Sequence, residues 1–399
     1  MENQDPIVIV GSARTPLGDL LGVLSTLQAT DLGAVAIKAA IERAKLKPED
    51  IDEVIMGCVL PAGLGQAPAR QAAIKALLPT SVHCMTINKV CGSGMKAVML
   101  AHDLLVTGTD KIIVAGGMES MSNAPYLLDK ARAGYRLGHG KMIDHMLLDG
   151  LEDAYEKGTS MGVYAERTAE KYQFTRNDQD EFAMDSLKRA LEATKNSWFL
   201  SDVEITPTSI KPHKGEPKLI QEDEHPQNVK AEKIPTLKPA FKEGGTVTAA
   251  NSSSISDGAA ALVLMRLSET KRRGIKPIAK ILGHASFSQD PAWFTTAPVK
   301  AIERLLNKLN WTKETPDFYE INEAFACVTM AAMHDLKIPR DKVNVHGGAC
   351  ALGHPIGASG ARIITTLLGA LKHYNKTLGI ASLCIGGGEA TAVAIEGGL

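Results

Sequence analysis

An internal repeat constrains the fold of this 399-residue chain more than any other feature of its sequence. Residues 40–57 (AIERAKLKPEDIDEVIMG) and 305–322 (LLNKLNWTKETPDFYEIN) align without a gap, and each indicates a helix end, a polar turn and a strand. Three further pairs of segments match in the same order along the chain: 6–13 with 277–286, 93–117 with 359–387, and 257–264 with 388–395. Four ordered matches predict a duplication of two related halves.

Short apolar runs alternate with helical patterns in both halves, as is typical of α/β folds. Between residues 117 and 257 this pattern is replaced by a region rich in Gly, Pro and charged residues. A connection this long is rarely structureless, so we expect an inserted lobe there, either a solvated surface or a cover for a ligand. The predicted organisation is an N-terminal half at 1–120 plus 251–272, a loop domain at 121–250 and a C-terminal half at 273–399.

Composition excludes several classes of function. The chain has 44 basic and 45 acidic residues and only 5% aromatic residues, which argues against a nucleic-acid or anionic-membrane partner. No apolar run approaches the roughly 18 residues of a membrane span, and the acidic segment 1–6 is unlike a targeting peptide. Six dispersed cysteines indicate neither a disulfide scaffold nor a zinc site. We therefore expect a cytoplasmic protein without a bound metal.

Two candidate catalytic residues occupy matching turns of the halves. Cys91 lies in NKVCGSG, between an extended run and a helix start, where backbone N–H groups stabilise a thiolate and lower its pKa. His354 lies in GHPIGASG, where Pro355 keeps it out of the α region and glycines clear space around the ring. The two turns converge if the halves pack about a pseudo-twofold axis, which makes His354 a candidate base. A buried structural cysteine and an ordinary histidine are the alternatives.

Two other residues are weaker candidates on local grounds. Cys384 ends an apolar strand before glycines 386–388, whose N–H groups can form an oxyanion hole, but a core cysteine is an equally good interpretation. Asn322 follows the predicted strand 318–321 and can orient a water or donate to an oxyanion, although Asn is also an ordinary turn residue. The sequence has no Walker A, HExxH or strand-following GxGxxG motif.

Four motifs together resemble the thiolase family: VCGSGMKAV around Cys91, NEAFA from Asn322, GHPIGASGAR around His354 and CIGGGEATA from Cys384. The resemblance runs from VGSARTP at 10–16 to the C-terminus and includes GGMESMS at 116–122. It implies a duplicated thiolase fold, in which two five-stranded βαβαβαββ halves pack as α/β/α/β/α layers around an inserted loop domain that holds coenzyme A. It also implies a homotetramer arranged as a dimer of dimers, or at least a dimer.

The resemblance further implies a role for each motif. Cys91, activated by His354, is expected to take an acyl group from one acyl-CoA, and Cys384 to remove the α-proton of a second acetyl-CoA. The resulting carbanion attacks the acyl-enzyme in a Claisen condensation. One oxyanion hole is expected to comprise His354 and a water held by Asn322, and the other the backbone N–H groups of Cys91 and Gly386. Coenzyme A is then a substrate or product, and no prosthetic group is needed.

By the same resemblance, seven residues are expected to contact the substrate: Met161, Phe241, Ala249, Ser253, Phe294, Ala324 and Phe325. The segment 142–154 resembles the acetoacetyl-CoA (biosynthetic) branch, in which this loop leads to the tetramerisation contacts. The expected function is therefore that of an acetyl-CoA C-acetyltransferase of lipid metabolism, which reversibly condenses two acetyl-CoA into acetoacetyl-CoA and CoA.

Three positions depart from the pattern of that branch. Ser160 stands where a histidine is usual, Phe294 where a pocket methionine is expected, and Gln227 where an arginine lies near the adenine. The first two lie where the acyl group and thioester should sit, so a degradative 3-ketoacyl-CoA thiolase with longer-chain substrates is the alternative. A non-catalytic CoA-binding protein is a third reading, against which the intact catalytic set speaks.

Overall fold

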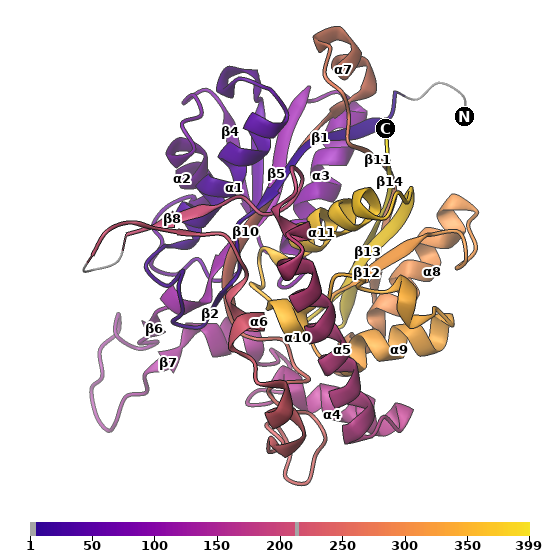
Figure 1. Cartoon of the computed structure of the whole chain (residues 1–399). Coiled ribbons are helices and arrows are strands. Elements are labelled where there is room, and N and C mark those ends of the chain that lie inside the picture. The colour runs from indigo at the N-terminus through magenta and orange to yellow at the C-terminus, as the bar shows by residue number, and fades with distance from the viewer. Residues whose placement is uncertain (1–4, 212–214) are drawn as a thin grey trace.

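The computed structural model describes residues 5–211 and 215–399. Figure 1 shows the two halves side by side, the N-terminal half in indigo to magenta and the C-terminal half in orange to yellow. The described residues do not include 1–4 or, in the loop domain, 212–214. Residues 1–4 belong to the segment 1–6, on which the expectation about a targeting peptide rests.

One hydrogen-bonded sheet runs through both halves in the order β12-β13-β14-β11-β1-β10-β5-β3-β4. The strands of the N-terminal half are β1 (Ile7–Arg14), β2 (Gly18–Asp19, paired with β10), β3 (Glu53–Gly57), β4 (His83–Ile87), β5 (Ile112–Ser120) and β10 (Ser256–Arg266). Those of the C-terminal half are β11 (Ala279–Ser288), β12 (Phe318–Ile321), β13 (Leu378–Ile385) and β14 (Glu389–Gly397). The halves meet where β1 pairs with β11 over two residue pairs.

Helices form three layers around these strands. The outer layer of the N-terminal half contains α1 (Ala29–Arg43) and α2 (Pro68–Lys75), the central layer α3 (Ser93–Thr107) and α11 (Ser359–His373), and the outer layer of the C-terminal half α8 (Ala297–Leu309) and α9 (Ala326–Leu336). Alternation along the strands explains this arrangement, because successive side chains point to opposite faces. In β1, Val8 and Val10 pack toward α1 and α2, whereas Ile7 and Ile9 face the central helices. The result is the α/β/α/β/α architecture that the resemblance implied.

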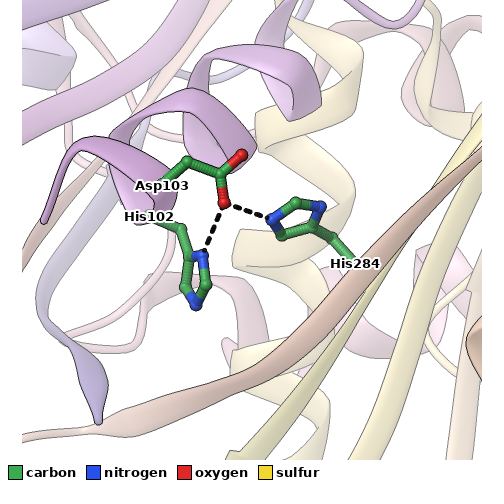
Figure 2. Close-up of side chains that lie close together, drawn as sticks. All are labelled: His102, Asp103 and His284. Carbon is green, nitrogen blue, oxygen red and sulfur yellow. Dashed lines mark hydrogen bonds and ion pairs between the residues drawn. The ribbon is translucent and has the colours of Figure 1, made fainter. Parts of the chain in front are cut away.

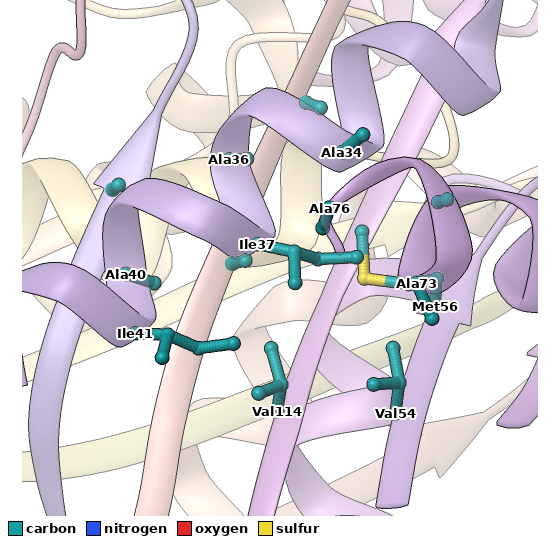
Figure 3. Close-up of a cluster of buried hydrophobic side chains, with 14 of the residues drawn as sticks. Ala34, Ala36, Ile37, Ala40, Ile41, Val54, Met56, Ala73, Ala76 and Val114 are labelled. Carbon is teal, nitrogen blue, oxygen red and sulfur yellow. The ribbon is translucent and has the colours of Figure 1, made fainter. Parts of the chain in front are cut away.

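The outer core of the N-terminal half shows how the helices attach to the sheet (Figure 3). Ile37 and Ile41, one helical turn apart on α1, are buried with Val54 and Met56 of β3 and Val114 of β5. Alanines occupy much of the remaining buried face of α1, so the helix packs closely on the strands. Each large buried side chain contributes about 1.5–3 kcal/mol through removal of apolar surface from water.

Two glycines allow the central helices to touch at their N-terminal ends. A Cβ atom at Gly94 of α3 would lie 2.8 Å from the backbone nitrogen of Ala361, and one at Gly360 of α11 would lie 2.3 Å from that of Met95. Only glycine permits backbones to approach this closely. The glycines occupy equivalent positions in the repeat, so they bring the two matching turns together, as the duplication predicted.

The halves differ in one respect from the expected pair of five-stranded units. The N-terminal half has the order β1-α1-β3-α2-β4-α3-β5-β10, interrupted by the insertion. In the C-terminal half the third strand is reduced to an isolated bridge between Tyr319 and Val343, so it contributes four named strands. The intervening chain runs on to α10 (Ala349–Leu352) and the turn before α11.

The insertion between β5 and β10 forms a lobe with its own helices and short strand pairs. It contains β6 (Tyr126–Leu127) paired with β7 (Ile143–Asp144), α4 (Met161–Tyr172), α5 (Arg176–Lys195), β8 (Thr208–Ile210) paired with β9 (Lys218–Ile220), and α6 (Glu224–Asn228). A short helix, α7 (Leu267–Arg273), then joins the halves. The domain boundaries predicted from the sequence stay a prediction. Within the described ranges, no helix has both the length and the apolar character of a membrane span.

Candidate active site

The turn that carries Cys91 is strained immediately before the cysteine. Val90 has φ 45°, a left-handed conformation that a β-branched residue rarely adopts. The Val90 N–H donates to the side-chain oxygen of Asn88 at 2.9 Å, and the Ser93 hydroxyl donates to the carbonyl of Val90 at 2.7 Å. These two bonds hold the turn, and α3 begins at Ser93. Strain of this kind persists only where the surrounding structure supports it, and it is concentrated at functional sites.

The Cys91 sulfur lies beside two backbone donors. Cys91 is half-buried, and the backbone N–H groups of Gly386 and of Cys91 itself act to lower the pKa of its thiol. Burial nevertheless outweighs these donors and raises the pKa of Cys91 to about 11. The predicted lowering of this pKa by the helix N-terminus is therefore wrong, because desolvation disfavours the thiolate more than the N–H groups favour it. The thiol needs a base to become a nucleophile.

His354, the predicted base, has one ring nitrogen with a free lone pair. Nδ1 lies 2.5 Å from the Ser359 hydroxyl oxygen, and that hydroxyl donates to the carbonyl of Pro355 at 2.9 Å. Because Ser359 has a single proton, already used, the Nδ1–H of His354 must be the donor in the first bond. Nε2 then carries the lone pair, and it is buried with no hydrogen-bond partner in the described part of the chain. Burial, reinforced by the charge of Arg362, lowers the pKa of His354 to about 3, so the ring is neutral.

Cys384 ends β13 next to Cys91 and is fully buried. Burial raises the pKa of its thiol well above the usual value, and the neighbouring Cys91 sulfur raises it further. Gly386 follows two residues later, and its N–H reaches Cys91. The two sulfurs and the glycine turn therefore share one location, although their motifs are almost 300 residues apart in the sequence.

Asn322 follows β12 with a free donor. Its backbone N–H donates to the carbonyl of Ser382, and its side-chain oxygen accepts a bond from Arg362 at 3.2 Å. The Nδ2 group is buried and has no acceptor among residues 5–211 and 215–399. A buried amide donor without a partner is costly, and such a group is well suited to bind a ligand atom or a water.

Most of the predicted substrate-binding residues surround Cys384. One apolar cluster contains Cys384 together with Met161, Phe241, Phe294, Ala324 and Phe325. Ser253 adjoins this cluster, since both its N–H and its hydroxyl donate to the carbonyl of Ala324 at 3.0 Å. The sulfur of Met161 lies near Gly386, 3.5 Å from the position of a Cβ atom there.

Ala249 lies apart from that cluster. It lines a cavity of about 300 Å³ between α5 and α6 together with Leu237, Lys230 and Lys233. The cavity has an apolar wall and cationic groups at its edge, a combination that suits a ligand with an apolar arm and phosphates. The predicted substrate residues thus divide between an inner apolar cluster and this outer cavity.

Family profiles match almost the whole chain. The thiolase N-terminal domain matches residues 7–268 and the thiolase C-terminal domain matches residues 275–397. The chain belongs to the thiolase family. An acetyl-CoA acetyltransferase of Cupriavidus necator is 50% identical to this thiolase over 391 residues, which cover 98% of this chain and 99% of the relative.

Solved structures agree with this assignment. The acetyl-CoA acetyltransferase of Bacillus anthracis superposes with a TM-score of 0.96 at 39% identity, covering 100% of both chains. The Acat5 thiolase of Ascaris suum, solved in complex with coenzyme A, has a TM-score of 0.92 at 42% identity and covers 98% of this chain and 100% of its own. The fold class expected from the sequence is thereby confirmed.

The three unusual positions of this thiolase have different environments. Ser160 precedes α4 as its N-cap residue but makes no side-chain capping bond. Phe294 is buried and packs edge-on against Tyr164, with ring centroids 6.2 Å apart. Gln227 lies on the short helix α6 of the loop domain, between two residues that line the outer cavity, His225 and Asn228.

Sequence reasoning missed Glu119, which connects the two halves beside the site. Its buried carboxylate accepts backbone N–H groups from Val59 and Leu60 of one half and from Gly357 of the other, at 2.9–3.1 Å. Burial raises its pKa to about 7, against the lowering effect of these bonds. The signal was present in GGMESMS, where an acidic residue ends an otherwise uncharged strand, but its partners are distant in the sequence.

Proposed function

We propose that this thiolase is an acetyl-CoA acetyltransferase, which reversibly joins two acetyl-CoA into acetoacetyl-CoA and CoA through an acyl-Cys91 intermediate. The observation that carries the proposal is the meeting of two cysteine sulfurs and the N–H of Gly386 beside an apolar cluster. The matching turn, which the close approach of Gly94 and Gly360 brings alongside, carries a buried imidazole lone pair. The names of the relatives support the choice of acetyl-CoA as substrate.

In the first step, Nε2 of His354 takes the proton of the Cys91 thiol, and the thiolate attacks the carbonyl carbon of acetyl-CoA. The carbon–sulfur bond to CoA breaks, and the proton on His354 passes to the departing CoA thiolate. The Nδ1–Ser359 bond supports this role because it keeps the proton of the neutral ring on the far nitrogen. Because the ring is neutral, its Nε2 lone pair is available to accept a proton.

In the second step, Cys384 acts as its thiolate and removes the α-proton of another acetyl-CoA, and the proton that it gains passes to the Cys91 thiolate once condensation has released it. The carbanion attacks the acetyl carbonyl of the acyl-enzyme, forming the new carbon–carbon bond as Cys91 leaves as a thiolate. Two cysteines are needed because Cys91 is acylated when the proton moves. In the reverse direction Cys384 gives the proton back to the leaving carbanion.

Two oxyanion holes stabilise the negative charge that develops in these steps. One is formed by the N–H groups of Cys91 and Gly386, a role supported by their convergence on the Cys91 sulfur. The other is formed by His354 and a water held by Asn322, supported by the free Nδ2 donor. Preorganised donors of this kind contribute several kcal/mol to a transition state, on the order of 3 kcal/mol each.

Coenzyme A serves this reaction as substrate and product, without a prosthetic group. We propose that its pantetheine arm passes Phe241, Ser253 and Ala249, and that its thioester lies by Met161, Ala324 and Phe325. Lys230 and Lys233 at the outer cavity take the place of the cation missing at Gln227 and face the phosphates.

A homotetramer, arranged as a dimer of dimers, is part of the proposal. The β6–β7 region exposes several large apolar side chains, Leu128, Leu137, Met142 and Leu147. Such patches are typical of protein interfaces. Strand β4 ends the sheet, and Met85 on it is exposed, which suits pairing with another copy.

A cytoplasmic location and a role in lipid metabolism are also proposed. All six cysteines are free thiols, as is typical of proteins in reducing compartments. The proposed substrates and products, short acyl-CoA thioesters, are building blocks and breakdown products of lipids.

A degradative 3-ketoacyl-CoA thiolase is the second candidate, because Ser160 and Phe294 depart from the pattern of the acetoacetyl-CoA branch. The experiment that decides is thiolysis by the purified protein with coenzyme A, comparing acetoacetyl-CoA with 3-ketoacyl-CoA chains of six to ten carbons. We expect the highest kcat/KM with acetoacetyl-CoA, because the Phe294 ring fills space that a longer chain would need. A preference for the longer chains would establish the degradative function instead. Binding of CoA without turnover would identify a non-catalytic protein.

A further inference from the structure

A cluster of two histidines and an aspartate, none of them assigned to the proposed catalytic set, joins the two halves (Figure 2). His102 and Asp103 lie in the C-terminal part of α3, and His284 lies on β11. One oxygen of Asp103 is 3.1 Å from Nδ1 of His102 and 2.9 Å from Nε2 of His284. The two imidazole rings meet edge to face, with centroids 5.1 Å apart.

The three donor atoms have the composition of a transition-metal site. They lie within 4.8 Å of one another, and two imidazole nitrogens with one carboxylate oxygen are a common ligand set for zinc. In a tetrahedral zinc complex neighbouring donors are roughly 3.3 Å apart, given metal–ligand distances of about 2.0–2.1 Å. The two distances to Asp103 are within a few tenths of an ångström of that value, so small side-chain movements are sufficient.

Charge and exposure also favour a cation here. The carboxylate of Asp103 places one oxygen between the two imidazole rings, within hydrogen-bond distance of a nitrogen of each. Half of the Asp103 side chain is exposed, so solvent reaches the cluster and can supply the remaining ligands. Lys308 is a positive charge that opposes binding of a cation, since its ammonium lies close to the cluster and donates to the backbone carbonyl of His284 at 3.3 Å.

We propose that His102, Asp103 and His284 form a binding site for a divalent transition-metal ion of the zinc type. The ion takes Nδ1 of His102, Nε2 of His284 and one oxygen of Asp103, with water completing its coordination. Each ring then carries its proton on the far nitrogen, which is a change of tautomer and leaves the ring neutral.

Such a site would connect the N-terminal half to the C-terminal half. Its ligands come from the central helix α3 and from the strand β11 that borders the junction with β1. An ion that binds only the folded chain stabilises it in proportion to the logarithm of its free concentration. Zinc is therefore expected to raise the Tm without entering the proposed reaction.

The test is equilibrium dialysis of the full-length chain against buffered free Zn²⁺, with bound zinc measured per chain. We expect His284→Ala and Asp103→Asn to lower the affinity of one zinc per chain by at least about tenfold, because each removes or weakens a ligand. The zinc-dependent rise in Tm should disappear in both variants. With Co²⁺ as the probe, the bound ion should lack the intense thiolate charge-transfer absorption.

A matched control separates this site from ordinary surface pairs. His334 and Asp335 on α9 are also adjacent in the sequence, with Nδ1 and a carboxylate oxygen 2.9 Å apart, and the metal-ligand cluster found in the described residues does not include them. His334→Ala should therefore leave zinc binding and the shift in Tm unchanged. Equal zinc affinity in the wild type, His284→Ala and Asp103→Asn would overturn the proposal, as would a thiolate spectrum with Co²⁺. Asp103→Asn keeps the side-chain shape, so its zinc affinity tests the proposed site even if His284→Ala fails to fold.

Discussion

The turn before α3 and the turn before α11 occupy matching positions in the two halves, and each places its reactive residue directly after a residue with positive φ. Before His354 that residue is Gly353, with φ 104°, where the conformation costs little. Before Cys91 it is Val90, where a β-branched side chain makes the same kind of turn strained.

The two turns also differ in burial and in hydrogen bonding. His354 is almost completely buried and fixed through one nitrogen by Ser359, so it offers a lone pair. Cys91 is half-buried and surrounded by N–H donors, so it offers a sulfur next to sites for negative charge. The two matching turns therefore present different groups in different backbone conformations, an imidazole after Gly353 and a thiol after Val90.

The largest expected effect comes from removing the nucleophile. Cys91→Ser should lower thiolysis by more than about 10³-fold, since a hydroxyl in this site does not replace the thiolate. Labelling with radioactive acetyl-CoA followed by denaturation measures the acyl-enzyme directly, and no label should remain on the protein. Cys84→Ser, a change at another partly exposed cysteine, is the control and should label normally. Unchanged labelling of Cys91→Ser would show that the nucleophile does not lie in this turn.

Cys384→Ala should separate the two half-reactions. The variant still acquires the acetyl label, because Cys91 and His354 are intact, but condensation should fall by about 10²–10⁴-fold, the usual contribution of a general base. Parallel measurement of labelling and of acetoacetyl-CoA formation tests both parts. Normal condensation would assign the α-proton to another group.

A smaller effect is expected from Ser359→Ala, which leaves the His354 ring in place but releases its far nitrogen. Acylation should slow by about tenfold to a hundredfold, as for other losses of orientation in an active site. The rate of acetyl labelling is the readout, and Ser359→Thr should restore most of it because the hydroxyl is retained. Equal rates in the alanine variant and the wild type would contradict the role of Ser359 in orienting the histidine.

Two buried histidines of the C-terminal half, His346 and His354, should each contribute to acid sensitivity. Burial lowers the pKa values of His354 and His346 to about 3, whereas the unfolded chain binds these protons near pH 6.5. Above that pH both states are neutral and the contribution is constant. Between about pH 6.5 and 3 these two rings gain protons only in the unfolded state, so each ring lowers the free energy of unfolding by roughly 1 kcal/mol per pH unit as the pH falls.

His346→Phe tests this dependence outside the active site. His346 is fully buried among aromatic side chains, including Trp198 and Phe199, and in the described residues neither of its ring nitrogens has a hydrogen-bond partner. Replacing the imidazole by a phenyl ring should remove the contribution of His346 to the change of unfolding free energy with pH. Urea denaturation at several pH values measures this change. The same change at the exposed His334 should leave the slope unaltered.

Much of this thiolase was predictable from short segments. The repeat indicated two α/β halves because strand alternation and helical periodicity are local properties, and the glycines of the matching turns marked where backbones approach. The inner substrate cluster was predicted through the family motifs, and Met161, Phe241, Phe294, Ala324 and Phe325 do lie together around Cys384. The reduced third strand of the C-terminal half had no such signal, since strand pairing depends on partners remote in the sequence.

The sequence by itself determined the duplication and the turns that hold the candidate reactive groups, because these depend on residue type and spacing. Only the tertiary structure decided how those groups ionise and which atoms they present. The pKa of Cys91 rises because the folded chain removes its sulfur from water, and the lone pair of His354 lies on Nε2 because Ser359 occupies the other side. Desolvation and long-range hydrogen bonding exist only after the two halves have packed together.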